Sequence, residues 1–542
     1  MNSRTLSSWP RTYSILWGAL ATFTLVLSST GCTMVGPNYV RPSVPTTADW
    51  IETNEPTIKR EPADVSAWWT VFQDPVLNTL VETAYRQNPS LQAAGVRVLE
   101  AQAQRGIAIG QLFPQQQEAV GEFSRNDLSK NKANRNAPTL KTPFDDWQIG
   151  FEATWELDVW GRFRRAIESA DATLLASTAT YDDVLVSLVA EVATNYLQLR
   201  IFQERLAVAH ANVVIQERSY YIANAKFQGG TATELDAAQA GSLLRDTEAQ
   251  IPALETGIRQ TQNTLCTLLG IPPQDLQHLL GGQRAIPSPP TELSVGVPSD
   301  LLRRRPDIRR AERTLAAQSA QIGVATADLL PSFALLGTIS LSAEHFDDLF
   351  KSNSFENFGG PSFRWAILNY GRIQNNVRVQ DARFQALIGD YENTVLRAQE
   401  EVESAVAGFL GARRQVEFLT DSVASASHAV ELADFQYREG TADYTRVLNS
   451  QQFLVGEQDR LVTTRGSVVL NLVSLYRALG GGWEWRIGKD FVPDLVKAQM
   501  QERTNWGDLL STEDQAKDIN AATSGTESDQ GSWRWRPWRP KW

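Results

Sequence analysis

The 542-residue sequence predicts a mixed, mainly α-helical protein whose chain is a tandem duplication, and three observations lead to this fold class. Short motifs recur at a fixed offset in the two halves of the chain. Each half contains stretches in which apolar and polar residues alternate with a period of two, which is typical of strands. Each half also contains long proline-free stretches with apolar residues at three- and four-residue steps, which indicate long amphipathic helices.

The duplication rests on matching motifs in the two halves. "TWELDVWGRFRR" (154–165) matches "RWAILNYGRIQN" (364–375). Four pairs agree on a sequence offset of 210: Trp155 and Trp365, Gly161 and Gly371, Gly230 and Gly440, and Leu269 and Leu479. Upstream, Pro114 matches Pro331, and the offset there is 217. Agreement at several positions predicts two structural repeats, 76–297 and 298–483.

Two strands are expected in each repeat, placed at 115–126, 146–158, 332–342 and 361–369. The clearest of them alternates apolar residues from Trp147 to Leu157 with polar residues such as Gln148 and Glu152. Such a strand has one apolar and one polar face. Its length is about that of a barrel strand crossing a membrane.

Four long helices are expected to follow the strands, at 162–227, 232–270, 372–437 and 443–479. At about 1.5 Å per residue, the first would be roughly 100 Å long. Alanine-rich helices with narrow apolar seams favour coiled-coil packing. An ordinary elongated helical bundle is the alternative. A shorter helix is expected before the strands of each repeat.

The N-terminal segment 1–31 has the order of a secretory signal peptide. Arg4 and Arg11 precede an apolar stretch, and small residues follow it up to Gly31. Cys32 comes next, which resembles a bacterial lipoprotein signal, where Cys32 would become the lipidated N-terminus. An ordinary signal peptide with an incidental cysteine is the alternative. The other cysteine, Cys266, lies in an apolar helical pattern and is expected to be a buried thiol, so no disulfide is expected.

The composition argues against several classes of function. The net charge of -11 disfavours a nucleic-acid surface. The four histidines are scattered without metal-ligand spacing, and the sequence contains no P-loop, dinucleotide-binding or nucleophile-elbow motif. The sequence therefore predicts neither an enzyme, nor a metal site, nor a cofactor other than a lipid on Cys32. The mean hydropathy of -0.28 and the 21% of charged residues argue against a multi-helix membrane protein, and no spanning helix is expected apart from the signal.

Four strands per chain cannot close a barrel. An open sheet edge cannot lie in lipid either, because its backbone groups would stay unpaired. Several chains are therefore expected to pool their strands, with polar faces lining a lumen and apolar faces meeting lipid.

The order of elements and the motifs "GPNYVRP", "LLRRRPDIRRAE", "ADLLPSF", "WELDVWGR" and "YREGTADY" resemble the TolC family of outer membrane factors. The similarity is greatest to its NodT-like lipoprotein branch, which serves resistance-nodulation-division pumps, and it covers about Cys32 to Trp483. It implies a homotrimer with a 12-stranded β-barrel in the outer membrane and a 12-helix α-barrel in the periplasm. It also implies an equatorial α/β belt, built from segments near 43–75, 271–298 and 483–510.

The resemblance divides the rest of the chain into a lipid-anchored N-terminal segment (32–75), a C-terminal equatorial segment (484–510) and a tail (511–542). The tail ends in the Trp- and Arg-rich "GSWRWRPWRPKW". This end would either bind an anionic envelope surface or be a disordered extension without a role. Family members usually have Asp where Asn38 stands.

The function implied by the resemblance is a passive exit duct for drugs or other small solutes. Its partners would be a periplasmic membrane-fusion adaptor, an inner-membrane pump and outer membrane lipids, and no nucleic acid. The protein would be lipid-anchored in the outer membrane and extend into the periplasm. Ducts for type I protein secretion or heavy-metal efflux are the alternatives. With only three methionines, no methionine relay for metals is visible.

The resemblance also implies two sites at the periplasmic ends of the long helices. The two helix breaks, called the hairpin tips here, would contact the adaptor: Gly229, Gly230, Thr231 and Ala232 in the first, and Gly440, Thr441 and Ala442 in the second. Nearby polar residues would form a periplasmic gate: Glu234, Asp236, Asp443, Arg446 and Asn449. Asp443 is equally well placed to be the N-cap of the last helix.

Overall fold

The computed structural model describes residues 34–511, except 53, 62–63, 130, 132, 134–141, 283 and 291. The expected signal peptide, the expected lipidation site Cys32 and the Trp/Arg-rich end of the tail lie outside the described residues. The chain is mainly helical, as predicted, and forms two compact units. The sheet unit contains residues up to Arg41, Ala101–Leu174 and Arg313–Ile388. The helical unit contains Pro42–Glu100, Leu175–Glu312 and the chain from Gly389 onward.

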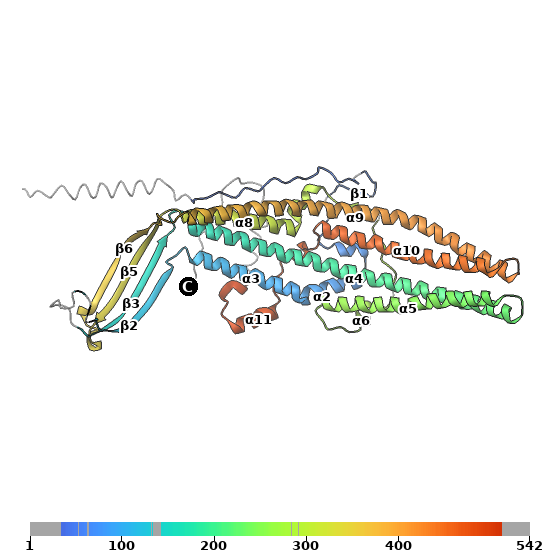
Figure 1. Cartoon of the computed structure of the whole chain (residues 1–542), viewed down its shortest axis with the longest axis horizontal. Helices are drawn as coiled ribbons and strands as arrows, with labels where there is room; N and C mark the ends of the chain where they lie inside the picture. The colour runs from blue at the N-terminus through green and yellow to red at the C-terminus, as the bar shows by residue number, and fades with distance from the viewer. Residues whose placement is uncertain are drawn as a thin grey trace, which may run out of the picture. The chain divides into compact units, whose positions relative to one another are not determined.

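The main helices occur as pairs of equal length, one in each repeat (Figure 1). The pairs are α3 (Pro89–Gly110) and α8 (Pro306–Ala327), with 22 residues each; α4 (Arg162–Gln228) and α9 (Arg372–Arg438), with 67; and α5 (Glu234–Leu268) and α10 (Tyr444–Ala478), with 35. The shorter helices are α2 (Pro75–Gln87), α6 (Gln277–Leu280), α7 (Leu301–Arg304) and α11 (Asp494–Arg503).

The sheet unit contains a four-stranded antiparallel sheet with the order β2-β3-β5-β6. Its strands are β2 (Gln116–Asn126), β3 (Phe144–Leu157), β5 (Ser332–Ala343) and β6 (Phe355–Arg364). The expected position of the last strand, 361–369, is wrong, because β6 begins earlier, at Phe355, which pairs with Leu341. The chain leaves the sheet after Arg364, and the next residue, Trp365, donates its indole hydrogen bond to the backbone oxygen of Leu329 at 3.0 Å.

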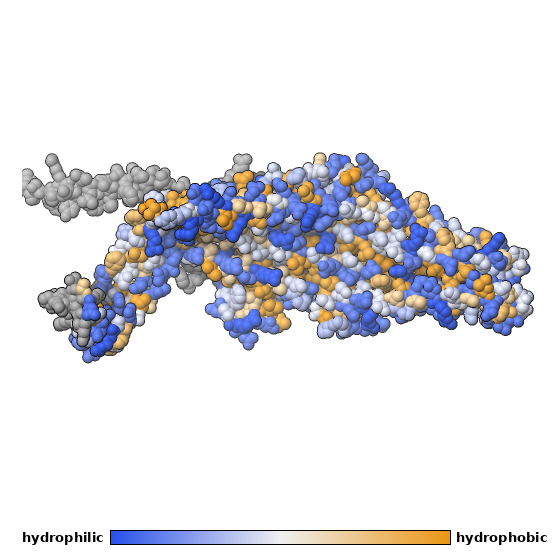
Figure 2. Space-filling view, in the orientation of Figure 1, coloured by the Kyte–Doolittle hydropathy of each residue, from blue (hydrophilic) through white to orange (hydrophobic). Residues whose placement is uncertain are grey.

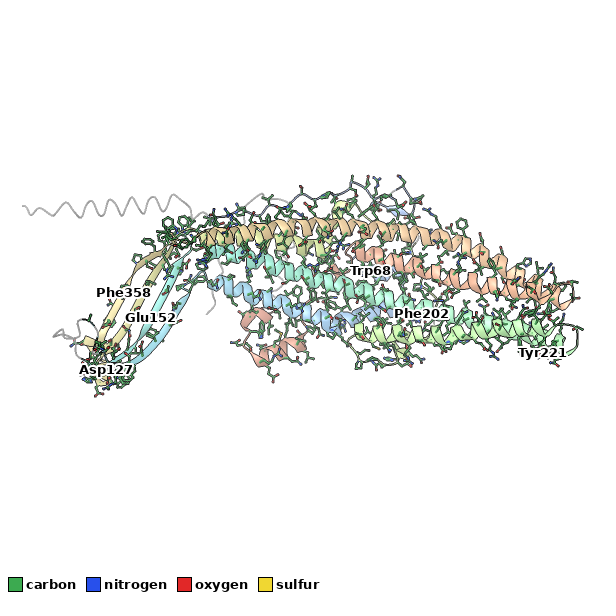
Figure 3. The ribbon with its side chains drawn as sticks, viewed as in Figure 1. Trp68, Asp127, Glu152, Phe202, Tyr221 and Phe358 are labelled. Atoms are coloured by element: carbon green, nitrogen blue, oxygen red, sulfur yellow. The ribbon has the colours of Figure 1, made fainter. Side chains whose placement is uncertain are left out.

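The pairing register gives the sheet two different faces. Ala119, Phe151 and Ile339 lie side by side on one face, and Phe151 and Ile339 are 69% and 57% exposed. Glu118, Glu152 and Thr338 lie side by side on the other. Phe358 is an apolar exception on the polar face, since it pairs with Thr338 (Figure 3 labels Glu152 and Phe358). The alternation read from the sequence is therefore the alternation of an amphipathic sheet.

Equivalent hydrogen bonds in the two repeats follow the offsets found in the sequence. The indole of Trp155 donates to the Leu112 backbone oxygen at 3.2 Å, as Trp365 does to Leu329. The Asn88 side chain donates to the Leu268 oxygen at 2.9 Å, and Arg305 donates to Ala478 at 2.8 Å. The donors Trp155 and Trp365 are 210 residues apart, and their acceptors Leu112 and Leu329 are 217 apart. The donors Asn88 and Arg305 are 217 residues apart, and their acceptors Leu268 and Ala478 are 210 apart. The repeats therefore share local contacts as well as helix lengths.

The helix α4 contains a window with a mean hydropathy of 1.2, which satisfies length and composition criteria for a membrane span. The sequence predicts no spanning helix beyond the signal, and α4 satisfies these criteria by length and composition only. However, 67% of the window is buried within the structure. Leu185, Val192 and Tyr196 are completely buried. Burial in a helical core therefore explains the apolar character of α4 without a membrane span.

Segments from three parts of the chain meet in the helical unit. The short strands β1 (Ile58–Lys59) and β4 (Leu293–Ser294) pair in parallel. The ring of Trp485, from the C-terminal segment, packs edge-on against Trp69 and Tyr85, with centroids 5.5 and 4.9 Å away. These contacts join the segment 43–75 to the segment 271–298 and to the segment 483–510.

Candidate functional site

Both hairpin tips are tight turns that require glycine. Gly230 and Gly440 have φ angles of 71° and 75°, in the left-handed region that glycine adopts most easily. The hydroxyls of Thr231 and Thr441 each donate a 3.1 Å hydrogen bond to a carbonyl of the preceding helix end. The two turns are therefore equivalent, and their glycines and threonines are exposed.

Two of the five expected gate residues cap helices. Asp236 forms a capping box with Thr233 at the start of α5, through bonds of 3.2 and 3.3 Å. Asp443 accepts a 3.3 Å hydrogen bond from the backbone N–H of Arg446, so it is the N-cap of α10. Such caps stabilise a helix by about 1 kcal/mol. Glu234, Arg446 and Asn449 are exposed, and a gate formed by these five residues remains a prediction.

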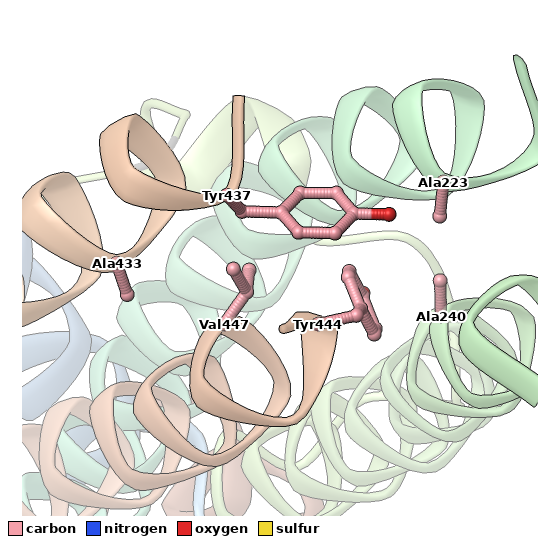
Figure 4. Packing of buried hydrophobic residues seen from close by; sticks show 6 residues of the cluster. All are labelled: Ala223, Ala240, Ala433, Tyr437, Tyr444 and Val447. Carbon is pink, nitrogen blue, oxygen red and sulfur yellow. The ribbon is translucent and has the colours of Figure 1, made fainter. Parts of the chain in front are cut away.

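A buried cluster behind the tips was not predicted from the sequence. Tyr437 of α9 and Tyr444 of α10 pack with centroids 5.3 Å apart. Their neighbours in the cluster are small or short side chains: Ala223, Ala240, Ala433 and Val447. Figure 4 shows the ring of Tyr437 reaching toward Ala223 of α4. The cluster joins α4, α5, α9 and α10, so it connects the two helical hairpins of the chain.

Lys226 of α4 makes a direct polar contact between these hairpins. Its ammonium donates to the backbone oxygens of Tyr437 and, at 3.3 Å, of Arg438, the last two residues of α9. It also lies 4.3 Å from the centroid of the Tyr437 ring. The last carbonyls of a helix lack partners within the helix and carry partial negative charge. Lys226 therefore caps the C-terminus of α9 from the other hairpin.

The same region contains buried polar groups without partners among the described residues. They are both amide atoms of Gln216, the side-chain oxygen of Gln451 and the hydroxyl of Tyr437. Burial raises the pKa of Tyr437 to about 12, and the carboxylate of Asp236 contributes, so the hydroxyl stays protonated. Each unsatisfied buried group costs about 1–3 kcal/mol. The packing between the hairpins is therefore less stable here than an apolar core would be.

In the sheet unit, the "GPN" motif is clamped between α4 and α8. Arg165, which is 1% exposed, donates to the backbone oxygens of Val35 and Gly36 and to Asn38 Oδ1, at 3.2, 3.3 and 2.8 Å. Gly36 has a φ of 89°, and a Cβ atom there would lie 2.4 Å from the Cα of Gly323 in α8. We call residues 35–38 the N-terminal clamp.

Replacing Asn38 by aspartate is expected to tighten the N-terminal clamp, because the bond from Arg165 would then join two opposite charges. The bond from the Arg165 guanidinium to the Asn38 amide already has one charged partner, and a carboxylate at 38 would add the attraction between two opposite charges. Amide hydrogen exchange at residues 35, 36 and 38 should slow in Asn38→Asp and accelerate in Asn38→Ala; Pro37 has no amide hydrogen. Equal exchange in the two variants would show that the side chain at 38 does not hold the clamp.

No group of three or more His, Cys, Asp or Glu residues in the described part of the chain could hold a metal ion. Cys266 is a fully buried free thiol. The features that the described surfaces do offer are an amphipathic sheet, exposed turns and a polar contact between the two helical hairpins.

Comparison with known proteins identifies the family of the chain. The model of the outer membrane efflux protein family matches residues 80–271 and 297–481. The two matches begin 217 residues apart and end 210 residues apart, which are the two offsets of the internal repeat. The pyoverdine export outer membrane protein OpmQ of Pseudomonas putida is 34% identical over 77% of this chain and 88% of its own length. Nodulation protein T of Rhizobium leguminosarum bv. trifolii is 30% identical over 85% and 96%.

A solved structure of the outer-membrane channel OprN superposes on the chain with a TM-score of 0.79. It is 32% identical, and the alignment covers 83% of this chain and 99% of that channel. The chain therefore belongs to the outer membrane efflux protein family.

Proposed function

We propose that the protein is the outer membrane exit duct of a tripartite efflux system, which passively conducts drugs or other small solutes from an inner-membrane pump and a periplasmic adaptor to the exterior. The amphipathic four-stranded sheet carries this proposal, since its apolar face suits lipid and its polar face suits an aqueous lumen. Conduction needs no catalytic residue and no cofactor. The lipid on Cys32 would be the one covalent addition.

The two edges of the sheet support assembly with further copies of the chain, and we propose a homotrimer. In the described chain, β2 and β6 each pair on one side. Edges in lipid must be paired, and three chains of four strands would close a 12-stranded barrel continued by a 12-helix α-barrel. Exposed apolar residues on the long helices also favour assembly, among them Val214, Phe418 and Phe435, which are 66%, 75% and 63% exposed. Figure 2 shows further hydrophobic residues on the helix surfaces.

The N-terminal clamp supports lipidation of Cys32. Met34 lies against Gly161, in the turn between β3 and α4, where an added Cβ would be 2.6 Å from Met34 Cγ. In the proposed barrel, this turn, which comes shortly after the end of β3 at Leu157, would lie at the membrane boundary. A lipid on the segment that precedes Met34 would then be well placed to enter the inner leaflet of the outer membrane.

The hairpin tips are proposed to receive the adaptor, with the gate beside them. Both tips are exposed, and Tyr221, near the end of α4, is 74% exposed (Figure 3). The relatives named above are associated with pyoverdine export and with nodulation, so their names do not agree on one substrate. Type I protein secretion and heavy-metal efflux remain the alternative uses of the same duct.

Replacing Ala442 by tryptophan is expected to reduce efflux to the level of cells without the duct, because the large ring would block close approach of the adaptor's helices. Trimer assembly should be unchanged, since Ala442 is half-buried in a turn whose neighbouring residues Thr441 and Asp443 are exposed. Efflux is measured as accumulation of a fluorescent substrate in cells, and assembly by size in detergent.

Ala442→Ser is the matched control and should keep full efflux. Full efflux by Ala442→Trp would place the adaptor contact elsewhere. Purified protein that forms no conducting pores in lipid bilayers would contradict the duct itself.

A further inference from the structure

The polar face of the four-stranded sheet carries an exposed aromatic side chain, Phe358 of β6. Phe358 pairs with Thr338, which pairs with Glu152, so these residues form one row across the polar face (Figure 3 labels Phe358 and Glu152). Phe144 belongs to the same face, but it is half-buried at the first position of β3. The side chain of Phe358 is 67% exposed, so packing within the described chain does not account for it.

The internal repeat has a polar residue at the equivalent position. Subtracting 210 from Phe358 gives Gln148 of β3, which pairs with Glu122 and Ser342 on the same polar face. A polar side chain is therefore compatible with this position of a strand. Phe358 departs both from the character of its face and from its counterpart in the other repeat.

The polar face around Phe358 is acidic. Its carboxylates are distributed over three of the four strands: Glu118, Glu122, Asp146, Glu152, Glu156 and Glu356. Within the four described strands, the one basic residue of this face is Arg364, the last residue of β6. A solute that touches this face therefore meets mainly negative charge.

The neighbours of Phe358 along β6 leave its ring accessible. Glu356 and Gly360 are each two residues away, and residues two apart on a strand share a face and lie about 7 Å apart. A Cβ atom at Gly360 would meet no atom within 4 Å, so there is free space beside the ring on that side. Glu356 is exposed and provides a carboxylate on the other side. A small organic molecule can therefore touch the ring and the carboxylate together.

We propose that Phe358 and Glu356 form a contact site in the lumen for organic cations, which are solutes with a positive charge and an apolar or aromatic body. A cation is attracted to the face of an aromatic ring, and the apolar body is stabilised by leaving water against the same ring. The carboxylates of the face attract the charge and disfavour anions of the same size. The inference rests on the proposed duct and adds to it the class of solute that its wall favours.

The proposed trimer would contain three such sites at one level of the lumen, because copies related by a threefold axis repeat each residue at the same height. A single contact between a cation and a ring at an exposed site is weak. Weak binding suits a duct, since a solute must bind well enough to enter and must still be able to leave. The contact site therefore influences which solutes pass and does not retain them.

Block of the potassium current through single trimers in planar bilayers tests the contact site. Benzyltrimethylammonium is the probe, and benzenesulfonate is an aromatic anion of similar size. The cation is expected to reduce the current at a lower concentration than the anion. In Phe358→Gln and Phe358→Leu, the concentration of the cation that halves the current should rise about fivefold, because both variants remove the ring and leucine keeps an apolar side chain. Phe358→Tyr keeps a ring and should be blocked like the unmodified channel.

Phe144→Gln is the matched control, since it removes the half-buried ring of the same face, and it should leave the block unchanged. Equal block of the unmodified channel and of Phe358→Leu, or equal block by the cation and the anion, would overturn the contact site and leave the duct intact. Loss of trimers in both the Gln and the Leu variants would assign the ring to packing between copies and would also overturn the site. Unmodified protein that carries no current in bilayers would contradict the duct itself.

Discussion

Replacing Asp182 by asparagine is expected to lower the free energy of unfolding by about 3–5 kcal/mol, the usual cost of removing one partner from a buried ion pair. Asp182 is completely buried in α4, and Arg486, which is 5% exposed, donates to its carboxylate. Arg309 of α8 donates to the same carboxylate at 3.3 Å. Asparagine would leave the two guanidinium charges without this counter-charge. Chemical denaturation of the purified protein in detergent, followed by helical circular dichroism, measures the change.

The next residue of α4 provides the matched control. Asp183 also faces an arginine, with Arg310 donating to it at 2.8 Å, but the side chains of this pair are 31% and 43% exposed. Solvent-exposed pairs contribute at most about 1 kcal/mol. Asp183→Asn should therefore change the denaturation midpoint little. If both variants lost the same stability, burial of the charge at Asp182 would not be the cause.

The sequence predicted the elements whose signals are local. Gly230 and Gly440 marked the hairpin tips, because a left-handed turn after a long helix favours glycine. Alternation along β3 predicted an amphipathic strand. The limits of β6 were wrong, because Gly359, Gly360 and Pro361 interrupt the alternation within the strand that the register defines.

The contacts that position the candidate sites were not predictable in the same way. Lys226 binds backbone oxygens of Tyr437 and Arg438, far away in the sequence, and Arg165 binds those of Val35 and Gly36. A carbonyl is present in every residue, so no pattern of side chains identifies it as a partner. The role of Asp443 as an N-cap was recognised as an alternative, since capping depends only on neighbouring residues.

Lys226 is expected to stabilise the closed state of the proposed gate, because it ties the end of α9 to the neighbouring hairpin. The cluster beside it packs alanines against two tyrosines, and the polar groups of Gln216 and Gln451 lack partners among the described residues. An interface with small side chains and unsatisfied polar groups contributes little to the stability of the packing between the two hairpins. The contact of Lys226 at their ends is therefore expected to contribute a large part of that stability.

Replacing Lys226 by methionine, which keeps a long side chain but removes its charge and donors, is expected to raise the resting conductance of single channels about tenfold or more. Hydrogen bonds from a charged group contribute about 1.5–3 kcal/mol, and each 1.4 kcal/mol shifts the closed-to-open ratio about tenfold. Planar-bilayer recordings measure the change, with trimer size in detergent as the control for assembly. Lys226→Arg keeps a charged donor and should retain low conductance. If Lys226→Met conducted like the unmodified channel, the two hairpins would not need this contact to stay closed.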